Sequence, residues 1–346
     1  MQIYEKSSRI EDSQTSSVDK LPKIVSLFCG AGGLDWGFYE QGFEIALAVD
    51  ISKAAIETHR RNFPETVSFA ADLLSLGPDG VFELVKANIK KGSRIGVIGG
   101  PPCQGFSRAN TASSKNDPRN KMPSLYLEIV AKFQGYYDVE FVVFENVLGI
   151  RDKKHRETYE SLVRGLAKLS FDITEKELCA LDFGVPQARK RIILSALKKG
   201  KYRPVLPQHT DGPKTVGCVI AGLPEPVFYS RSLTSGEIPF HANHWTMKPK
   251  SDRFLNPSKT YAPSRSFKKL CWSKPSPTVA YGNREIHVHP EGRRRLSIYE
   301  AMLLQGFPKE FVLMGNLSQQ VEQVSNAVPP PLSSGIAKAV KIAMEC

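Results

Sequence analysis

One cysteine of this chain stands where a predicted buried strand meets a Gly/Pro corner, a position suited to a nucleophile. The apolar run from Arg94 to Ile98 predicts a short strand, and the sequence GGPPCQGFS (99–107) ends it abruptly. Cys103, at that strand exit, could attack a bound substrate as a thiolate. The alternative for a single cysteine is a buried free thiol beside an ordinary turn. Other stretches of the chain decide between the two.

A carboxyl group and two guanidinium groups are further candidates for a reactive site. Glu145 lies in the sequence FENV (144–147), where another apolar run ends, and neighbouring strand exits of an α/β sheet lie close together. A thiolate needs a lowered pKa to attack well, and a carboxylic acid donates a proton at neutral pH only if its pKa is raised. Arg189 and Arg191 are two residues apart, so on an extended chain they project from one face toward one site. Taken alone, these arginines would be interpreted as an exposed basic patch.

A glycine-rich turn and two acids indicate a nucleotide-like cofactor. The turn FCGAGGL (28–34) lets the backbone approach a ligand closely, but the third glycine of a dinucleotide fingerprint would fall at Asp35, so a nicotinamide cofactor is not indicated. Asp50 ends the next strand, where a carboxylate reaches a ribose diol, and Asp72 follows another short strand, where it could accept from an adenine amino group. Each acid alone could equally be a helix N-cap. Together they favour an adenosine-containing cofactor without a pyrophosphate.

The elements that must position these residues form an α/β pattern. Predicted strands alternate with predicted helices, so we expect a doubly wound, mainly parallel sheet covered by helices on both faces, with ligands at the carboxyl ends of the strands. The predicted strands are residues 24–28, 45–49, 95–98, 141–144 and 192–197. The predicted helices are residues 54–62, 81–89, 125–133 and 158–169.

The basic excess of the chain is confined to one segment. The net charge is +12, and residues 198–296 hold 18 Lys and Arg against 6 Asp and Glu, so the rest of the chain is balanced. The same segment has ten aromatic residues and 12 of the 24 prolines, which predicts an irregular, β-rich insert. A basic, aromatic surface is typical of nucleic-acid binding, although a solvated surface is the alternative. Trp245 and Trp272 are expected in the core of this insert or against DNA.

Other features narrow the classes of protein. The six cysteines never form a C-x-x-C pair, and the pairs His241/His244 and His287/His289 lack nearby carboxylates, so we expect no metal site. No apolar run approaches the ~18 residues that span a bilayer. We therefore expect no membrane association and a location in a reducing cytoplasm. Residues 1–20 are polar and Ser-rich, and we expect a disordered tail there.

In order along the chain, FCGAGG, PPCQGFS, FENV, QARKR, RRLSIYEAMLLQGFP (294–308) and QVSNAVPPPL (323–332) resemble the motifs of the DNA (cytosine-5) methyltransferases. The resemblance implies catalytic roles for Cys103, Glu145, Arg189 and Arg191, and S-adenosylmethionine as the cofactor. The implied cofactor site is Phe28, Gly30, Gly32, Gly33, Leu34, Asp50, Ile51, Asp72, Leu73, Pro102, Asn326 and Val328. The implied DNA-binding residues are Gln104, Ser107, Arg108 and Thr278. One departure is small, because the family more often has Glu where this chain has Asp50.

The resemblance also implies a division of the chain and a reaction. A catalytic domain (21–200 and 318–346) would carry a target-recognition domain (201–296) joined by a connection (297–317), with the last helix folding back onto the first domain. The Cys103 thiolate would add to C6 of a flipped-out cytosine while Glu145 engages N3, and C5 would then take the methyl group. The short chain fits a monomeric bacterial modification enzyme, associated with the nucleoid and paired with a restriction endonuclease. The alternatives are a tRNA cytosine-5 methyltransferase, a catalytically silent DNA-binding module and, more remotely, a dehydrogenase.

Overall fold

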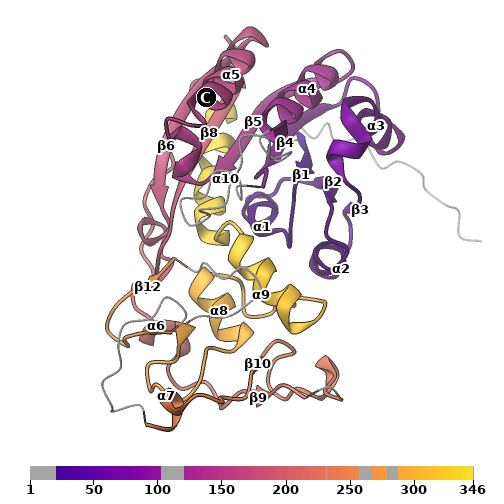
Figure 1. Ribbon diagram of the computed structural model, residues 1–346. Helices are drawn as coiled ribbons and strands as arrows, with labels where there is room; N and C mark the ends of the chain where they lie inside the picture. Colours follow the sequence, from indigo (N-terminus) through magenta and orange to yellow (C-terminus); the bar gives the residue numbers. More distant parts are fainter. Residues whose placement is uncertain (1–20, 103–120, 231, 257–266, 279–286, 346) are drawn as a thin grey trace, which may run out of the picture.

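A computed structural model describes residues 21–102, 121–230, 232–256, 267–278 and 287–345. Its upper part is a seven-stranded sheet with strand order β3-β2-β1-β4-β5-β8-β6 (Figure 1). Strands β1 to β5 pair in parallel, while β8 runs antiparallel to both of its neighbours. The strands are β1 (Lys23–Leu27), β2 (Ile45–Asp50), β3 (Val67–Ala70), β4 (Arg94–Gly99), β5 (Asp138–Asn146), β6 (Phe171–Cys179) and β8 (Lys190–Lys198). The predicted doubly wound, mainly parallel sheet is confirmed.

Helices cover the sheet on both faces because its strands alternate two apolar sets of side chains. In β1, Val25 and Leu27 face the cluster that includes α3, α4 and α5, whereas Ile24 faces the cluster that includes α1 and α10. These helices are α1 (Gly33–Glu40), α3 (Leu73–Asn88), α4 (Met122–Gln134), α5 (Arg156–Lys168) and α10 (Pro330–Glu345). A further helix, α2 (Lys53–Asn62), follows β2. Both faces of the sheet are therefore buried, as continuous Val- and Ile-rich strands require.

The last helix folds back onto the first, as expected. Gly37 makes the close approach possible, since a Cβ there would lie 2.2 Å from the backbone nitrogen of Ser334 in α10. The hydroxyl of Ser333 donates to the carbonyl of Leu34, and the Lys341 ammonium donates to the carbonyl of Gln41 at 3.0 Å. The C-terminal segment is thus held directly beside the glycine-rich turn.

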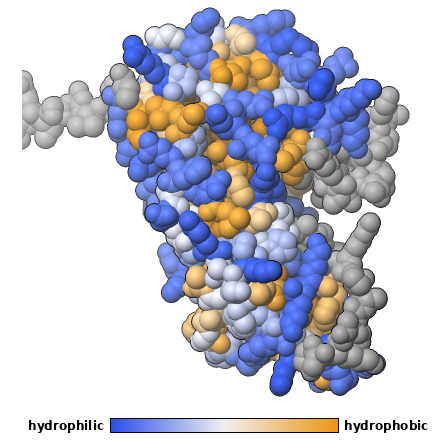
Figure 2. Space-filling view, turned by 90° about the vertical axis from the view of Figure 1, so that its left-hand side faces the viewer, coloured by the Kyte–Doolittle hydropathy of each residue, from blue (hydrophilic) through white to orange (hydrophobic). Residues whose placement is uncertain are grey.

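The lower part of Figure 1 contains the basic segment, whose described strands are only two residues long. Its elements, with the partner strand β7, are β7 (Gln187–Ala188), α6 (Gly217–Ile220), β9 (Val227–Phe228), β10 (Trp245–Thr246), α7 (Asp252–Leu255), β11 (Lys268–Lys269), β12 (Ser276–Pro277) and β13 (His287–Val288). Trp245 is buried in this part, whereas Trp272 is 37% exposed, so a core position is wrong for Trp272 and its other expected position, against DNA, stays a prediction. Figure 2 shows the two parts from the side, with a mostly hydrophilic surface on which hydrophobic side chains form separate patches.

Two helices join the parts. Every residue of α8 (Ile298–Gln305) is buried, and α8 forms a core with Trp245 and with α9 (Leu317–Asn326). The stretch 297–317, which the sequence predicts to be a connection, therefore contains the central helix of the second hydrophobic core. The domain boundaries themselves remain a prediction.

Candidate functional site

A cavity of about 380 Å³ lies at the carboxyl ends of the strands. The turn after β1, the ends of β2 and β5, the corner after β4 and the helix α9 all contribute to its wall. Eleven of the twelve predicted cofactor residues line it, namely Phe28, Gly30, Gly33, Leu34, Asp50, Ile51, Asp72, Leu73, Pro102, Asn326 and Val328. Glu145, Arg189 and Arg191 line the same cavity. The structure thus brings together residues that are up to 300 positions apart in the sequence.

Asp50 shapes the glycine-rich turn. Its Oδ2 accepts from the backbone nitrogen of Gly30 at 2.9 Å, and its Oδ1 accepts from that of Ser52 at 2.8 Å. Burial raises the pKa of Asp50, although these two backbone hydrogen bonds oppose the shift. Phe28, the first residue of the turn, has a φ of 55°, a left-handed conformation that side chains rarely adopt. The carboxylate therefore fixes the turn and keeps lone pairs free to accept from hydroxyl groups.

Two of the predicted cofactor residues stabilise the local structure. Asp72 is the N-cap of α3, accepting from the backbone nitrogen of Leu74 at 3.0 Å, and it also lines the cavity, so its contact with an adenine amino group stays a prediction. Gly32 does not line the cavity. Its φ is 92° and a Cβ there would lie 2.4 Å from the ring of Phe63, so this glycine lets the turn pack on α2.

Glu145 and Arg191 form an ion pair in the cavity wall. The Glu145 Oε1 lies 2.8 Å from Arg191 Nε, and Glu145 is 7% exposed. Burial raises the pKa of Glu145, while the nearby guanidinium groups of Arg191 and Arg189 oppose the rise. A Cβ on Gly100 would lie only 2.8 Å from Glu145 Oε2. The carboxyl group therefore stands directly beside the Gly/Pro corner, and it holds a proton more readily than an exposed glutamate does.

Arg189 is anchored from the other side of the cavity. It is 1% exposed, and its Nη1 donates to the carbonyl of Ser325 in α9 at 3.0 Å. Gln187, two residues earlier, donates to Gln305 of α8 at 2.6 Å. The sequence QARKR thus places Arg189 and Arg191 on one site, as their spacing predicts, while also tying the sheet to α8 and α9.

The remaining predicted site residues fall into two groups. Cys103, Gln104, Ser107 and Arg108 lie outside the described residues, whereas Pro102 directly precedes them and lines the cavity. Thr278 is described, and its hydroxyl donates to the carbonyl of Ala188 at 2.7 Å. That bond and the pairing of β12 with β7 hold the basic segment against the QARKR strand.

Sequence reasoning missed several residues of the site. Asn146 donates to the carbonyl of Pro101 at 3.1 Å and so fixes the corner that leads to Cys103. The sequence does offer a signal for Asn146, since an amide side chain next to Glu145 at the end of one strand can bond to the backbone at the end of a neighbouring strand. Gln319 and Gln323 of α9 also line the cavity, and nothing in a ten-residue polar helix marks them out.

The histidines considered as ligands pack within the protein. His241 stacks on Tyr299 with ring centroids 4.0 Å apart, and His244 contacts the Ser297 hydroxyl at 3.0 Å. Within the described parts of the chain, no three His, Cys, Asp or Glu side chains gather closely enough to hold a metal ion. Cys29 is buried against Ala48 and Ile56, which fits a packing role.

The fold and site together define a class of protein. A doubly wound sheet with a fixed glycine turn, a strand-end carboxylate, and an acid paired with arginine in one cavity is typical of an enzyme that transfers a group from an adenosine-containing cofactor. Position 35, where a dinucleotide fingerprint would have its third glycine, is occupied by Asp35, which is fully buried and lies 3.3 Å from His59 Nε2.

Comparisons with known proteins give the family. The profile for C-5 cytosine-specific DNA methylase matches residues 22–342, and the chain belongs to this family. The type II methyltransferase M.NmeDI of Neisseria meningitidis serogroup C is 32% identical over 99% of this chain and 89% of its own length. M1.HphI of Haemophilus parahaemolyticus, another type II methyltransferase, is 34% identical over 91% of this chain and 86% of its own.

Solved structures agree on the fold. A DNA modification methyltransferase encoded within an E. coli prophage superposes with a TM-score of 0.77 at 24% identity, covering 94% of this chain and all of the other. The Spodoptera frugiperda DNMT2 variant superposes with a TM-score of 0.66 at 19% identity, covering 93% of this chain and all of the other.

The predicted fold, enzyme class and reaction are thereby confirmed: the protein transfers a methyl group to C5 of cytosine in DNA. Its family depends on S-adenosylmethionine and acts within restriction-modification systems. No helix in the described part of the chain combines the length and the apolar character needed to cross a bilayer.

Proposed function

We propose that this enzyme methylates one cytosine within a short duplex DNA sequence, through a covalent bond between Cys103 and C6 of the flipped-out base. The observation that carries the proposal is the buried ion pair of Glu145 and Arg191, beside the corner that leads to Cys103. A cytosine ring has a basic nitrogen at N3, and a carboxyl group with a raised pKa is suited to share a proton with it.

The cavity fits S-adenosylmethionine in its donor and acceptor groups. The half-buried Asp50 carboxylate can accept from a ribose diol, and the exposed side chain of Ile51 beside it offers an apolar surface to a base. Asn326, at the end of α9, would form the far wall near the amino-acid end of the cofactor. When bound, this cofactor supplies an electrophilic methyl group.

The protein's own residues then have the following roles. The thiolate of Cys103 donates an electron pair to C6, and the proton on or near Glu145 stabilises the negative charge that this addition places on the ring. C5 would become nucleophilic and take the methyl group as the bond between that methyl and the cofactor sulfur breaks; a base would then remove the C5 proton, and its electron pair would expel the Cys103 thiolate from C6. Arg191 holds the Glu145 carboxyl in place, and Arg189, fixed by the Ser325 carbonyl, presents its charge to the base or the adjoining phosphate.

The basic segment is proposed to read the target sequence. Lys268 and Lys269 of β11 are exposed, and the described part of the segment is rich in Lys and Arg. Gln104, Ser107 and Arg108, which follow Cys103 directly, and Thr278 remain proposed DNA contacts. We also propose that the enzyme is a monomer, that it is paired with a restriction endonuclease, and that it acts on bacterial DNA in the cytoplasm.

The test is transfer of labelled methyl from S-adenosylmethionine to unmethylated duplex DNA and, separately, to tRNA. We expect label in DNA at cytosines in one sequence context, located by bisulfite sequencing, and none with Cys103→Ser. Trapping of a protein–DNA adduct on 5-fluorocytosine DNA would demonstrate the covalent step. Label in tRNA alone, or turnover by Cys103→Ser close to that of the unmodified enzyme, would refute the proposal.

A further inference from the structure

Helix α9 contacts both the cofactor cavity and the basic segment. Gln323 and Asn326 line the cavity, and Gln320, on an adjoining side of the same helix, accepts from the indole nitrogen of Trp245 at 2.8 Å. An indole N–H can only donate, so the Gln320 amide must present its oxygen to the ring. Its nitrogen donates in turn to the Gly315 carbonyl at 2.9 Å, which leaves both ends of the Gln320 amide bonded.

The same helix is bound firmly to the cofactor-binding part. Gln323 accepts from the Thr58 hydroxyl of α2 at 2.6 Å and donates to the Met314 carbonyl at 2.9 Å. The Thr58 hydroxyl also accepts from the Met314 backbone nitrogen at 2.8 Å. All of these groups are buried or half-buried, so each lost bond would leave a polar group without a partner. Movement of α9 therefore moves the wall of the cavity with it.

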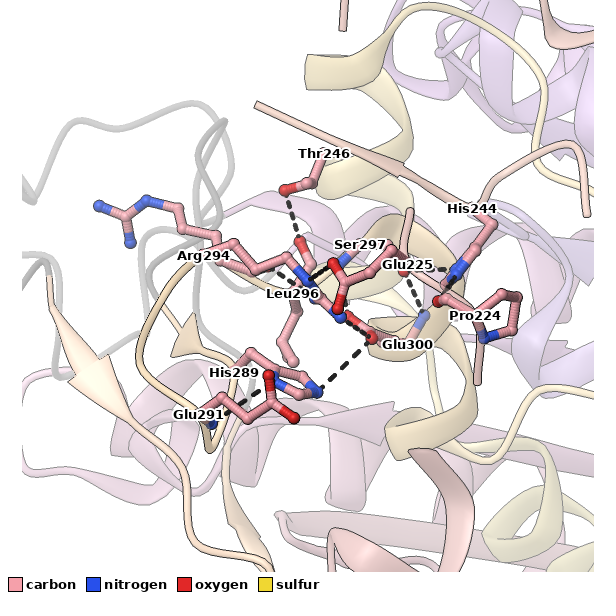
Figure 3. A network of polar contacts seen from close by, with 11 residues as sticks. Pro224, Glu225, His244, Thr246, His289, Glu291, Arg294, Leu296, Ser297 and Glu300 are labelled. Carbon is pink, nitrogen blue, oxygen red and sulfur yellow. Dashed lines mark hydrogen bonds and ion pairs between the residues drawn. The ribbon is translucent and has the colours of Figure 1, made fainter. Parts of the chain in front are cut away.

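The residues on either side of Trp245, His244 and Thr246, belong to an arrangement of polar contacts in the basic segment (Figure 3). The neighbouring His244 contacts both the Ser297 hydroxyl, at the start of α8, and the Pro224 carbonyl. Behind Ser297, Arg294 makes a bidentate ion pair with Glu300 at 2.8 and 2.9 Å.

Two further bonds complete this arrangement. Arg294 also reaches Glu225 at 2.9 Å, and Thr246 donates to the Leu296 carbonyl at 2.9 Å. Residues far apart in the basic segment are thus tied to the beginning of α8. A restraint applied at Trp245 therefore acts on this arrangement rather than on one side chain.

We propose that α9 couples occupancy of the cofactor cavity to the order of the basic segment, with Gln320 as the positioning residue that makes the connection. A ligand packed against Gln323 and Asn326 reduces the motion of α9, and the Gln320–Trp245 hydrogen bond passes this restraint to the segment. Once one ligand has ordered the segment, the second ligand loses less conformational entropy when it binds. Binding of the cofactor would therefore favour binding of DNA, and binding of DNA would favour binding of the cofactor. This inference rests on the proposed cofactor site.

The test is hydrogen–deuterium exchange of the whole protein with and without S-adenosylhomocysteine. In the unmodified protein, the ligand should slow exchange in the glycine turn (28–35) and also around Trp245 (243–246), by about fivefold or more. In Gln320→Met, which keeps the side-chain length but removes the acceptor, the turn should remain protected while the effect at 243–246 disappears. Trp245→Phe should give the same pattern, and the double variant should add nothing further.

A matched control separates coupling from general loss of stability. Tyr137, directly before β5, is buried and donates to the Ile89 carbonyl at 3.2 Å, far from both regions in sequence, so Tyr137→Phe also removes a buried hydrogen bond and should leave both effects intact. The coupling inference is wrong, while the cofactor site stands, if ligand-induced protection at 243–246 persists in Gln320→Met. The same conclusion follows if that protection is absent from the unmodified protein while the glycine turn is protected. No response in either region overturns the cofactor site as well.

Discussion

Replacement of Glu145 by Gln isolates the proton that the proposed mechanism requires. The amide keeps the shape of the side chain and can still present an oxygen to Arg191 Nε, which lies 2.8 Å from the carboxylate. It cannot share a carboxylic proton with N3 of the base. General acid catalysis contributes about 10²–10⁴-fold in rate, so kcat should fall by that factor, or about 3–5 kcal/mol in activation free energy.

The same substitution should not weaken the fold. Burial raises the pKa of Glu145 in the folded state, so the unfolded chain loses this proton at lower pH than the folded protein does. The contribution of this group to stability is therefore full below the unfolded pKa and lost as pH rises through the folded pKa. Above the folded pKa the ionised carboxyl opposes folding, and Glu145→Gln, which cannot ionise, should keep or raise Tm. For the same reason, kcat of the unmodified enzyme should decline as pH rises through the raised pKa.

Glu140 provides the matched control on the same strand. It is fully buried at the far end of β5, where Arg94 and Lys201 lie 2.8 and 2.6 Å from its Oε1, and the Tyr202 hydroxyl donates to its Oε2. Burial alone would raise the pKa of Glu140, but the hydrogen bonds from Lys201, Tyr202 and Arg94 outweigh it and lower that pKa. The stabilisation is therefore present above the unfolded pKa and lost as pH falls through the folded pKa.

Glu140→Gln should thus lower stability by roughly 3 kcal/mol and flatten its acid dependence, while kcat of the folded enzyme is retained. Methyl transfer is measured under saturating cofactor and DNA, with thermal unfolding followed in parallel. If Glu145→Gln retains kcat within about threefold, the assignment of Glu145 as the proton-sharing group is wrong. If its kcat falls only together with Tm, the loss is structural, and the argument from the raised pKa fails.

Three further substitutions test the geometry of the site. Gly100→Ala places a Cβ 2.8 Å from Glu145 Oε2, so it should lower kcat about tenfold or more while S-adenosylhomocysteine binding, measured by calorimetry, changes little. Asp50→Asn removes the charge that fixes the Gly30 nitrogen and should raise the Kd for S-adenosylhomocysteine about tenfold, and an unchanged Kd would remove Asp50 from the cofactor site. Gly37→Ala forces α1 and α10 apart and should lower stability by about 1–3 kcal/mol in thermal unfolding, whereas Gly135→Ala, whose Cβ finds only an ordinary contact at 3.6 Å, should have little effect.

The strand exits could be predicted from sequence because burial and chemistry leave separate signals there. Apolar runs give the strands of a parallel sheet, and the residue after each run is free to serve a ligand. This logic found Asp50 and Glu145, the two-residue spacing of Arg189 and Arg191 on an extended chain indicated that they share a site, and the structure places all four around one cavity. The edge strand β6 was missed because most of its side chains are half-buried or exposed, which leaves no apolar run to detect.

The second hydrophobic core could not be predicted in the same way. Residues 298–305 are apolar except for Glu300 and Gln305, a pattern that indicates a buried helix but not the partners that bury it. Trp245 and Trp272 were both expected either in the core of this insert or against DNA, and the fold buries Trp245 while it leaves Trp272 37% exposed. Composition therefore identified the basic segment but not which of its side chains face inward.

Buried amides are the part of this site that sequence reveals least. Gln320 and Gln323 occupy neighbouring positions on a polar helix, where local patterns predict only solvent exposure. Each of these amides is nevertheless buried. Its oxygen accepts from a group more than 50 residues away, and its nitrogen donates to a nearby carbonyl. An unpaired buried amide is costly, so each one requires specific partners. Such bonds have exacting geometry and little tolerance for displacement. They are therefore well suited to hold the basic segment, which we propose to read DNA, in a fixed relation to the proposed cofactor cavity, as methyl transfer to a base held between the two would require.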